Sequence, residues 1–597
     1  MRVSEQIADW LVRQGIEQVF AVTGGGAMFL NQALGSHIGL HCTFMHHEQA
    51  CAFAAEGYAR IAGKPAVVML TTGPGAINAF NGVFGAFTDS IPMLVISGQV
   101  KRETCLSFQD HPKLRQLGDQ EGPTVAMAQN ICKSAQIVRN PDDIAKALPE
   151  ALALATRGRP GPVWLDIPLD VQSATATLPI PDLPPHAPSA DDPDLNAACD
   201  RIIDKLRNAH RPLILAGTGV RLAGAVDALR ELAERHGIPI ATAWTHDLIE
   251  SDHPLFASRP GTIGTRAGNF CLQSADLVLV IGSRLNIRQT SYNWDSFGKN
   301  AWIAQVDIDA AELHKPGVNA DEKVIADASK FILTLQSRIT ELPDYSDWVN
   351  WCRNICSRYS VQKEHQQIPG SVLNPYVVVN QVFAAMREDD IAVCGNASAC
   401  ILPFQISRLK RGQRLFSNSG SASMGYDLPS AIGAAMACRR RVICFAGDGS
   451  LQMNIQELQT LKTSAANIII VVLNNAGYLS IWQTHENFFG RVVGATPATG
   501  IEFPDFNAVA SAYGIPNALI CKDCDMEHLA ELMKQDGPLL INVIVDPRQE
   551  FVPRIKSRVD ANGKFITPEL DDMHPFLDPS ELQAVRVSGA LVRARKP

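Results

Sequence analysis

The feature that most constrains the fold of this chain is an alternation of short apolar runs with longer, alanine-rich helical patterns. It recurs along most of the 597 residues. The apolar runs are rich in valine and isoleucine and show little polar alternation, as is typical of strands covered on both faces. Such strands, separated by helices, predict parallel sheets with helices on both sides. We therefore expect an α/β protein made of doubly wound parallel-sheet domains.

The alternation stops and restarts twice, which divides the chain into consecutive blocks. The first block, residues 1–175, ends at a proline-rich stretch, 175–193, that is typical of a linker. A second block covers 190–345 and a third covers 370–550. The remaining residues, 551–597, show one helical pattern, SELQAVRV, and form a C-terminal tail. The sequence thus predicts three doubly wound domains followed by a tail.

Composition excludes several classes of protein. The chain is 46% hydrophobic and 19% charged, with a mean hydropathy of zero, and no apolar run approaches the roughly 20 residues that span a bilayer. The N-terminal residues do not have the basic-then-apolar order of a signal peptide. A net charge of −8 without a basic run argues against nucleic acid. We expect a cytoplasmic protein with neither a membrane nor a nucleic-acid partner.

One motif carries specific chemistry: GDGSLQMNIQELQTLKTSAANIIIVVLNN, residues 447–475. An apolar run ends in a glycine turn with Asp448, a helical pattern follows, and a second apolar run ends at Asn474 and Asn475. Neighbouring parallel strands deliver such side chains to the same sheet edge. Carboxylate and amide oxygens suit Mg²⁺, and the amides of the turn can cradle phosphates. Because GDG alone is a common turn, the paired asparagines carry this prediction.

This segment resembles the metal-diphosphate motif of thiamine diphosphate enzymes. The resemblance implies that Mg²⁺ is bound by the side chains of Asp448 and Asn475 and by the backbone carbonyl of Gly477. Met424, in SASMGYDLP, matches the bulky residue that bends the cofactor in that family, although an isolated methionine is more often core filler. The resemblance further implies contacts to the cofactor from Asn78, Asn396, Met424, Gly449, Ser450 and Gly477.

The first block adds an independent resemblance. The stretch from MHHEQACAFAAEGYARIAG to MLVISGQV resembles the acetolactate synthase family across nearly its whole length, and the likeness continues over roughly residues 1 to 550. It implies that Glu48 is the catalytic glutamate, which hydrogen-bonds the aminopyrimidine ring of the cofactor. The small alanines around Glu48 lead us to expect that its side chain is buried.

Two further residues of the first block are implicated by the same resemblance. Gln120 aligns with the glutamine of the family's FQE motif and Gly25 with its PGG glycines. The resemblance implies catalytic roles for both, with the amide of Gln120 orienting the donor or the acceptor. On general grounds Gln120, in LRQLGDQEG, is equally well explained as an ordinary loop residue.

The middle block resembles the FAD-binding domain of the acetolactate synthases. GTGVR, IGSRLNIRQ and QVDID match the corresponding stretches, and Arg284 matches the arginine of their GARFDDR. LNI stands here in place of FDD, and many relatives keep this domain as an empty scaffold. The resemblance implies FAD as a third cofactor, contacted by Arg284.

The resemblance implies a carboligase that decarboxylates pyruvate and transfers the two-carbon acyl-anion unit to a carbonyl acceptor. It also implies a homodimer or homotetramer, because Glu48 and Asp448 lie on different blocks and meet across two chains in this family. Thr484 stands where the family's synthases carry a tryptophan, and the tail MHPFLDPSEL resembles carboligases that form branched sugars. Acetyl transfer to a nucleotide-linked keto-sugar is thus one alternative. Pyruvate decarboxylase or oxidase activity, or a non-catalytic assembly role, are others.

Overall fold

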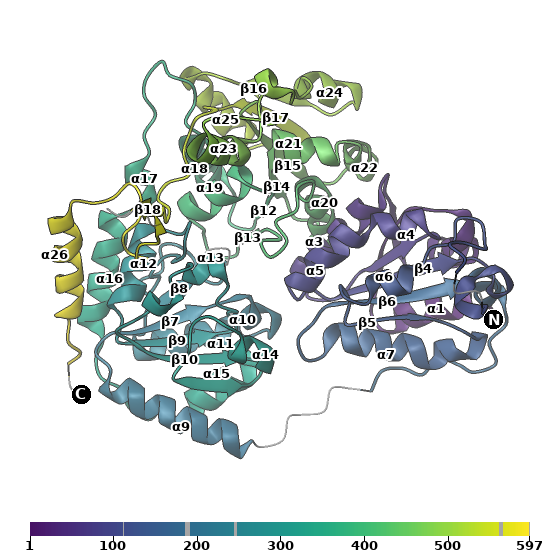
Figure 1. The fold of residues 1–597 in the computed structure, drawn as a ribbon, viewed down its shortest axis with the longest axis horizontal. Coiled ribbons are helices and arrows are strands. Elements are labelled where there is room, and N and C mark those ends of the chain that lie inside the picture. The colour runs from purple at the N-terminus through teal and green to yellow at the C-terminus, as the bar shows by residue number, and fades with distance from the viewer. Residues whose placement is uncertain (111–112, 185–191, 244–246, 560–564, 596–597) are drawn as a thin grey trace.

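The computed structural model describes residues 1–110, 113–184, 192–243, 247–559 and 565–595. As the sequence predicts, the chain forms three α/β units, each with a parallel sheet between layers of helices. In Figure 1 the N-terminal unit lies to the right, the middle unit at the lower left and the C-terminal unit above them.

The N-terminal sheet has the strand order β2-β1-β3-β4-β6-β5, and every pairing is parallel. Its topology reverses beside β1, where ligand sites of such sheets form. Its strands are β1 (Gln18–Ala21), β2 (His41–Phe44), β3 (Val67–Leu70), β4 (Met93–Gln99), β5 (Ser134–Ile137) and β6 (Pro162–Pro168). Its longer helices are α1 (Val3–Arg13), α2 (Met28–Ser36), α3 (Glu48–Ala62), α5 (Phe80–Thr88) and α7 (Ile144–Thr156).

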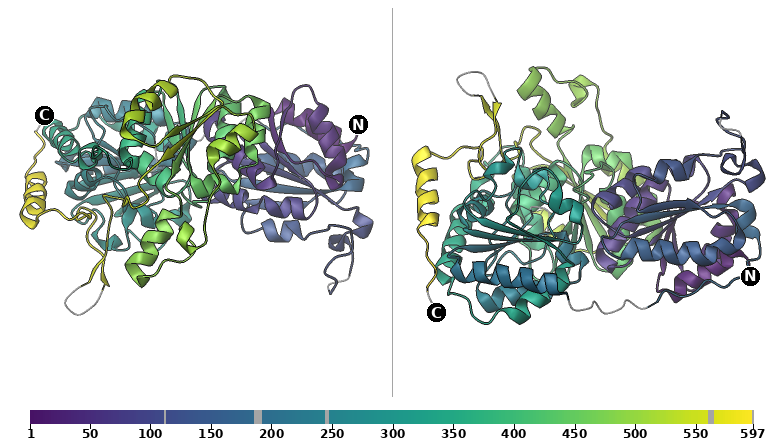
Figure 2. Two further views of the ribbon diagram at one scale, coloured as in Figure 1. Left: turned by 90° about the horizontal axis from the view of Figure 1, so that it is seen from above. Right: turned by 60° about the horizontal axis from the view of Figure 1, so that its bottom comes forward.

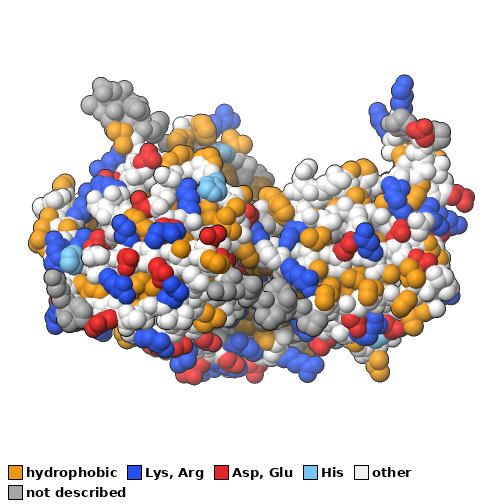
Figure 3. Space-filling view, turned by 90° about the horizontal axis from the view of Figure 1, so that it is seen from below, with side chains coloured by type: hydrophobic (Ala, Val, Ile, Leu, Met, Phe, Trp, Pro, Cys, Tyr) orange, Lys and Arg blue, Asp and Glu red, His pale blue; other side chains and the backbone are white. Residues whose placement is uncertain are grey.

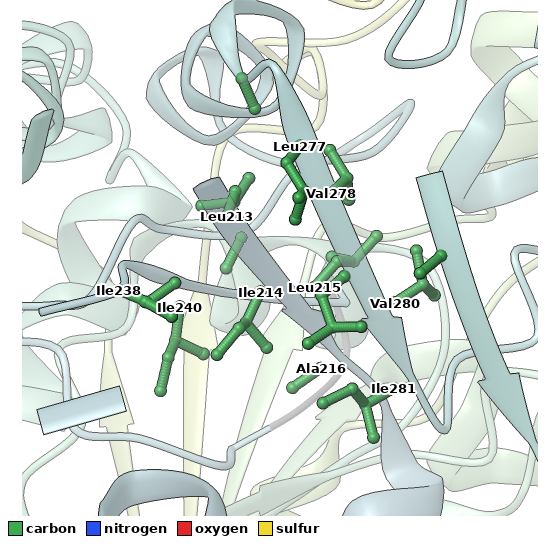
Figure 4. Close-up of a cluster of buried hydrophobic side chains, with 14 of the residues drawn as sticks. Leu213, Ile214, Leu215, Ala216, Ile238, Ile240, Leu277, Val278, Val280 and Ile281 are labelled. Atoms are coloured by element: carbon green, nitrogen blue, oxygen red, sulfur yellow. The ribbon is translucent and has the colours of Figure 1, made fainter. Parts of the chain in front are cut away.

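The middle sheet has the order β11-β10-β9-β7-β8 and is also parallel. Figure 4 shows part of its core, in which aliphatic side chains of β7 and β9 lie beside Ile238 and Ile240. Its strands are β7 (Pro212–Ala216), β8 (Ile240–Thr242), β9 (Leu277–Ile281), β10 (Trp302–Asp307) and β11 (Glu322–Ile325). Flanking helices include α9 (Pro193–Asn208), α11 (Val226–His236), α12 (Arg266–Ser274), α15 (Ala328–Arg338) and α16 (Ser346–Arg358).

The C-terminal sheet repeats the N-terminal pattern, with the order β13-β12-β14-β15-β17-β16. Its topology therefore reverses between β12 and β14. Its strands are β12 (Ile391–Cys394), β13 (Arg414–Phe416), β14 (Val442–Gly447), β15 (Ile468–Asn474), β16 (Asn517–Ile520) and β17 (Leu539–Ile544). Its helices include α18 (Pro375–Ala385), α19 (Ser398–Ile406), α20 (Asp427–Cys438), α22 (Glu457–Ser464) and α23 (Leu479–Phe489).

The C-terminal tail folds back onto the middle unit. It contains a short antiparallel pair, β18 (Arg558–Val559) and β19 (Phe565–Ile566), and ends in α26 (Pro579–Ala590). Leu570 and Val585 are buried in the same core as the middle sheet. Both views of Figure 2 place α26 on the outer side of the middle unit, away from the N-terminal unit. The tail is thereby held across the junction between the middle and C-terminal units.

The predicted linker is partly docked. Residues 185–191 of it lie outside the described residues. Upstream of them, the indole of Trp10 donates a hydrogen bond of 2.8 Å to the carbonyl of Pro181, and Asp142 accepts hydrogen bonds from Thr177. Ile180 is buried with the N-terminal core. The first part of this proline-rich stretch therefore belongs physically to the N-terminal unit.

The N-terminal and C-terminal units meet where α3 packs on α20. A Cβ atom at Gly433 would lie 1.8 Å from the carbonyl oxygen of Ala54, and one at Gly57 would lie 2.2 Å from that of Ser430. Glycines are thus required for the two backbones to approach so closely. Beside this contact, Arg60 forms buried ion pairs of 2.7 Å with Glu56 and 2.6 Å with Asp89. The helix packing fixes the two units against each other, and the amide of Gly420 in the C-terminal unit adds a hydrogen bond of 3.0 Å to Asp89.

The described surface shows neither a membrane-spanning helix nor, on the face drawn in Figure 3, a segregation of charge. None of the described helices is long and apolar enough to cross a membrane. On the face drawn in Figure 3, lysine and arginine side chains are interspersed with aspartate and glutamate over both halves of the molecule. That face therefore carries no broad field of one sign.

Gly433→Ala tests the close helix approach. The added methyl group has no space against Ala54, so the helices must separate, and we expect a loss of stability of about 3 kcal/mol. Thermal unfolding of the purified protein measures it. The control is Gly35→Ala, on α2, where the nearest atom would be 3.5 Å away. Equal melting temperatures of the two variants would contradict the packing described.

Candidate active site

Three polar residues lie at the carboxyl edge of the C-terminal sheet, beside its reversal point. Asn396 follows β12, Asp448 follows β14, and Asn475 follows β15. β14 pairs with both β12 and β15, and Gly447 lies opposite Leu473 in the register. The sheet therefore brings Asp448 and Asn475 to the same edge, where doubly wound sheets bind ligands.

Asp448 is held rigidly in its turn. It is 3% exposed, and it accepts hydrogen bonds from the amides of Gly449 at 2.7 Å and Gly477 at 3.1 Å. Burial raises the pKa of its carboxyl to about 6, against the lowering effect of those amides. Gly449 is required beside it, because a Cβ atom there would lie 2.1 Å from the ring of Tyr478.

The side chains around Asp448 form a set of converging oxygen atoms. The side-chain oxygen of Asn475 faces the carbonyl oxygen of Gly477 at 2.7 Å and Oδ2 of Asp448 at 3.3 Å. Rotation of the amide would turn both contacts into hydrogen bonds. In the orientation with oxygen inward, a carboxylate, an amide oxygen and a backbone carbonyl share one point, which is the donor set of a hard cation such as Mg²⁺. The residues thus fit the metal that the motif predicts.

Strained backbone surrounds this edge. Ala397, Ala422 and Ala476 have φ values of +47°, +53° and +57°, and Ser291 has +68°. Non-glycine residues adopt this left-handed region at a cost, and such residues cluster at ligand sites. Asn396 fixes two of them: its amide nitrogen donates to the carbonyl of Ala422, and its oxygen accepts from the amide of Ala397, both at 2.6 Å.

A cavity of about 680 Å³ opens over these residues. The C-terminal unit supplies Asn396, Met424, Asp448, Gly449, Ser450, Asn475 and Gly477, which are the candidates predicted for this block. The middle unit and the tail supply the rest of the lining, including Arg288, Ser291, Tyr292 and Arg554. Ser450 also orders Met424 indirectly, because its hydroxyl accepts from the amide of Gly425 at 2.8 Å.

The candidates of the N-terminal unit form a second group. Glu48 is the first residue of α3, and its Oε2 accepts a hydrogen bond of 3.0 Å from Asn78 of α4 (Pro74–Asn78). Gly25 follows β1, and Gln120 lies in a loop with φ of +61°. The carbonyl of Gln120 packs on Gly73, where a Cβ atom would be 1.9 Å away.

One expectation about this group is wrong in the single chain: Glu48 is only half-buried. The alanines that suggested burial, such as Ala50 and Ala54, are fully buried further along the same helix. Glu48 lies in the first turn of α3, before the helix meets α20, and its carboxylate opens onto a face where Gly25, Asn78 and Gln120 are exposed. None of these four residues lines the cavity of Asp448. The chain therefore carries two separate half-sites.

Two residues that the sequence reasoning did not single out connect these half-sites. Asn454 donates hydrogen bonds to Gln49 at 3.0 Å and to the carbonyl of Gly425 at 2.7 Å. Glu457, fully buried at the start of α22, accepts one of 3.1 Å from the amide of His46. The segment around Glu48 is thus held by the segment that follows Asp448. Both residues lie inside the GDG to NN motif, but their long-range partners leave no local signal.

Arg284 lies elsewhere, in a cavity of about 880 Å³ formed mainly by the middle unit. It follows β9 and is half-buried, and its carbonyl accepts a hydrogen bond from Lys315. The cavity is also lined by Gly219, by Arg221 and by Asp307 at the end of β10. Its size suits a dinucleotide-sized ligand.

Comparisons with known proteins agree with this geometry. Family models described as "Thiamine pyrophosphate enzyme, N-terminal TPP binding domain", "central domain" and "C-terminal TPP binding domain" match residues 1–121, 199–335 and 395–543. The chain is 31% identical to the acetolactate synthase isozyme 2 large subunit of Escherichia coli (strain K12), covering 92% of this chain and 97% of that protein. It is 30% identical to the acetolactate synthase large subunit of Lactococcus lactis subsp. lactis (strain IL1403), covering 96% and 97%.

A chloroplastic acetolactate synthase of Arabidopsis thaliana is 31% identical, over 92% of this chain and 82% of that protein. The three matched domains define a thiamine diphosphate-dependent enzyme. Within that class, the chain belongs to the acetolactate synthase large-subunit family.

Glu457→Gln tests the buried clamp. Burial raises the pKa of the Glu457 carboxyl from its ordinary value of 4.5 to about 7. Between these two pH values the carboxyl is therefore protonated in the folded chain and ionised in the unfolded chain. Ionisation therefore costs stability as pH rises through this window. Glutamine keeps the acceptor for His46 without the charge, so the variant should gain up to about 3 kcal/mol relative to wild type from pH 5 to 8.

Chemical denaturation across that pH range measures the difference. The control is Glu527→Gln, at an exposed position of α25 (Met526–Leu532), for which the difference should not change with pH. If the free energies of unfolding of Glu457→Gln and wild type differ by the same amount at every pH, this carboxyl does not titrate between pH 5 and 8.

Proposed function

We propose that this protein decarboxylates pyruvate and joins the resulting two-carbon unit to a carbonyl acceptor, as an acetolactate synthase does. The observation that carries the proposal is that one chain holds both half-sites: the oxygens of Asp448, Asn475 and Gly477 that converge at one, and Glu48, at the start of α3, at the other. The curated relatives named above are all acetolactate synthases. Acetyl transfer to a nucleotide-linked keto-sugar, and decarboxylase or oxidase activity, are therefore not favoured.

The residues divide the work as follows. Asp448, Asn475 and Gly477 would hold Mg²⁺, which binds the diphosphate, with Gly449 and Ser450 beside it. Asn396 and Met424 would hold the body of the cofactor against the strained turns. When bound, thiamine diphosphate supplies the nucleophilic carbon and accepts the electrons released with carbon dioxide.

Glu48 would hold and move the proton that prepares the cofactor. Asn78 donates to its Oε2, so Oε1 would be the oxygen available to hydrogen-bond the cofactor. Gly75 keeps that oxygen accessible, because a Cβ atom there would lie 3.0 Å from it. Gly25 and Gln120 would contact the reactants from the same face.

We further propose that the active unit is a homodimer or homotetramer in the cytoplasm, with residues 1–175 as the pyrimidine-binding domain and 370–550 as the diphosphate-binding domain. The two half-sites of one chain lie apart, so each would complete the site of a partner. Exposed apolar side chains of the N-terminal unit support such a contact: Met28, Ile77, Phe84, Phe87 and Met127.

FAD in the middle domain, residues 190–345, is a separate proposal. The cavity lined by Arg284, Gly219 and Asp307 has the volume and the strand-end carboxylate that a dinucleotide needs. Purified protein should release a yellow, fluorescent flavin on heating, and Arg284→Ala should retain less of it. A protein that takes up no flavin when mixed with FAD would contradict this proposal.

Thr484 stands where a tryptophan favours the larger acceptor in the family's synthases. Its helix, α23, begins at Leu479, which lines the cavity, but Thr484 is exposed and hydrogen-bonds back to Ser480. Thr484 itself does not line the cavity, so it contributes no side chain that would narrow it.

Glu48→Gln tests the proposal. Loss of the proton-transferring carboxyl should lower the release of labelled carbon dioxide from pyruvate by at least about 100-fold. Binding of thiamine diphosphate with Mg²⁺, followed by tryptophan fluorescence, should persist in this variant and be lost in Asp448→Asn. The control, Glu103→Gln, alters an exposed glutamate of the same unit and should match wild type. Undiminished turnover by Glu48→Gln would refute the assignment.

A further inference from the structure

The cavity over Asp448 has a polar end that the proposed reaction does not yet use. Its lining from the middle unit and the tail includes two arginines, Arg288 and Arg554, and the serine Ser291. Arg288 lies in the short helix α13 (Ile287–Thr290), Ser291 directly follows it, and Arg554 lies in the tail, four residues before β18.

These segments are joined by their backbones. The amide of Thr262 donates to the carbonyl of Arg288 at 2.8 Å, and the amide of Ile555 donates to the carbonyl of Thr262 at 2.7 Å. Arg554 is anchored beside them by a pair of backbone hydrogen bonds with His574, of 2.9 and 2.8 Å. The tail therefore brings Arg554 to the same end of the cavity as Arg288.

The two guanidinium groups at this end have no close anionic partner among the described residues. Nε of Arg554 is buried without a hydrogen bond, and the nearest carboxylate, that of Glu550, lies 3.9 Å from its guanidinium and also binds His574 at 3.2 Å. Arg288, at the exposed mouth of the cavity, takes part in none of the ion pairs found among the described residues. A guanidinium left without an anion in a cavity is poised to bind one.

Ser291 gives an independent indication. It is 1% exposed, its hydroxyl has no hydrogen-bond partner, and its backbone has φ of +68° and ψ of 173°. A buried hydroxyl without a partner costs stability, and so does a serine in this backbone region, where glycine is favoured. Both costs are explained if the hydroxyl donates to a ligand in the cavity.

We propose that this end of the cavity, through Arg554 and Ser291, binds a second anionic group of the carbonyl acceptor, remote from the reacting carbon. A simple 2-oxo acid offers one carboxylate, which a single guanidinium can hold in a bidentate pair. Two guanidinium groups and a buried hydroxyl match an acceptor that carries a further carboxylate or a phosphoryl group. The inference rests on the proposed carboligase function and names the class of acceptor.

The experiment uses the full-length protein with thiamine diphosphate, Mg²⁺ and labelled pyruvate, with products followed by mass spectrometry. Acceptors are compared in two pairs that differ in the remote anion: 2-oxoglutarate against 2-oxobutyrate, and dihydroxyacetone phosphate against dihydroxyacetone. We expect kcat/KM for the charged member of at least one pair to exceed that of its partner by about tenfold or more. The pair that responds identifies a carboxylate or a phosphoryl group.

Variants assign the effect to the residues. Arg554→Met and Ser291→Gly should each lower that ratio by about tenfold, mainly through KM for the charged acceptor, while Arg554→Lys restores part of it. Ser291→Gly should also raise the melting temperature, since it relieves the strained φ. The matched control is Arg548→Met, at an exposed position of the same segment that does not line the cavity.

Each other outcome has a defined meaning. Carbon dioxide release from pyruvate without preference in either pair overturns this inference alone. If the ratio of kcat/KM between the charged and the neutral acceptor is unchanged in Arg554→Met, that residue does not bind the remote anion. The same conclusion follows if Arg554→Met lowers kcat/KM equally for both acceptors and also weakens the binding of thiamine diphosphate. No carbon dioxide from pyruvate in wild type would instead refute the proposed function.

Discussion

The close contact between α3 and α20 is the constraint on which the rest of the structure depends. Gly57 and Gly433 let the helix backbones touch, and beside them Arg60 forms buried ion pairs with Glu56 and Asp89. α3 starts at Glu48, and α20 starts three residues after Met424. The contact between α3 and α20 therefore fixes the distance and angle between the two groups of candidate residues. A small shift of one helix against the other would move both groups.

This contact explains why one chain contains two half-sites. It holds the start of α3 over the segment from Asn454 to Glu457, so the face of Glu48 and the cavity of Asp448 open in different places. Within the chain they are mechanically joined, because His46 and Gln49 are bound by residues that directly follow the diphosphate turn. In an assembled dimer, the same hydrogen bonds would connect one active site with the other.

The cavity of Asp448 is completed by parts of the chain that do not belong to its own domain. The middle unit contributes Arg288 and Ser291, and the tail contributes Arg554, held by the backbone pairing with His574. The tail can do so because Leu570 and Val585 anchor it in the core of the middle unit. The cavity thereby combines the cofactor-binding candidates of the C-terminal unit with side chains of the middle unit and the tail, which we propose recognise the acceptor.

Sequence reasoning predicted most of the fold and much of the site, for physical reasons. The three parallel sheets follow from uninterrupted apolar runs, which are a local signal. The shared edge of Asp448 and Asn475 follows from the expectation that β14 and β15 are neighbours, and their pairing agrees with it. The half-burial of Glu48 was not predicted, because the buried alanines that follow it show that the backbone of α3 is packed and do not show where the longer side chain of its first residue reaches.

Other features depend on contacts that no local pattern records. The clamp by Asn454 and Glu457 joins residues about 400 positions apart. Arg554 lies in a tail with few periodic signals, and Ser291 is distinguished only by its φ value and its unpartnered hydroxyl. Such residues are found only once the tertiary structure is known.

The central claim is that Glu48 of one chain acts with Asp448 of another. Subunit mixing tests it most directly: Glu48→Gln and Asp448→Asn proteins, each inactive alone, are unfolded or dissociated together and reassembled. The account predicts that pyruvate turnover returns to about one quarter of wild type, since half of the dimers are mixed and each has one intact site. Reassembly into mixed dimers without any recovery would contradict it, and would place both residues in the same chain's site.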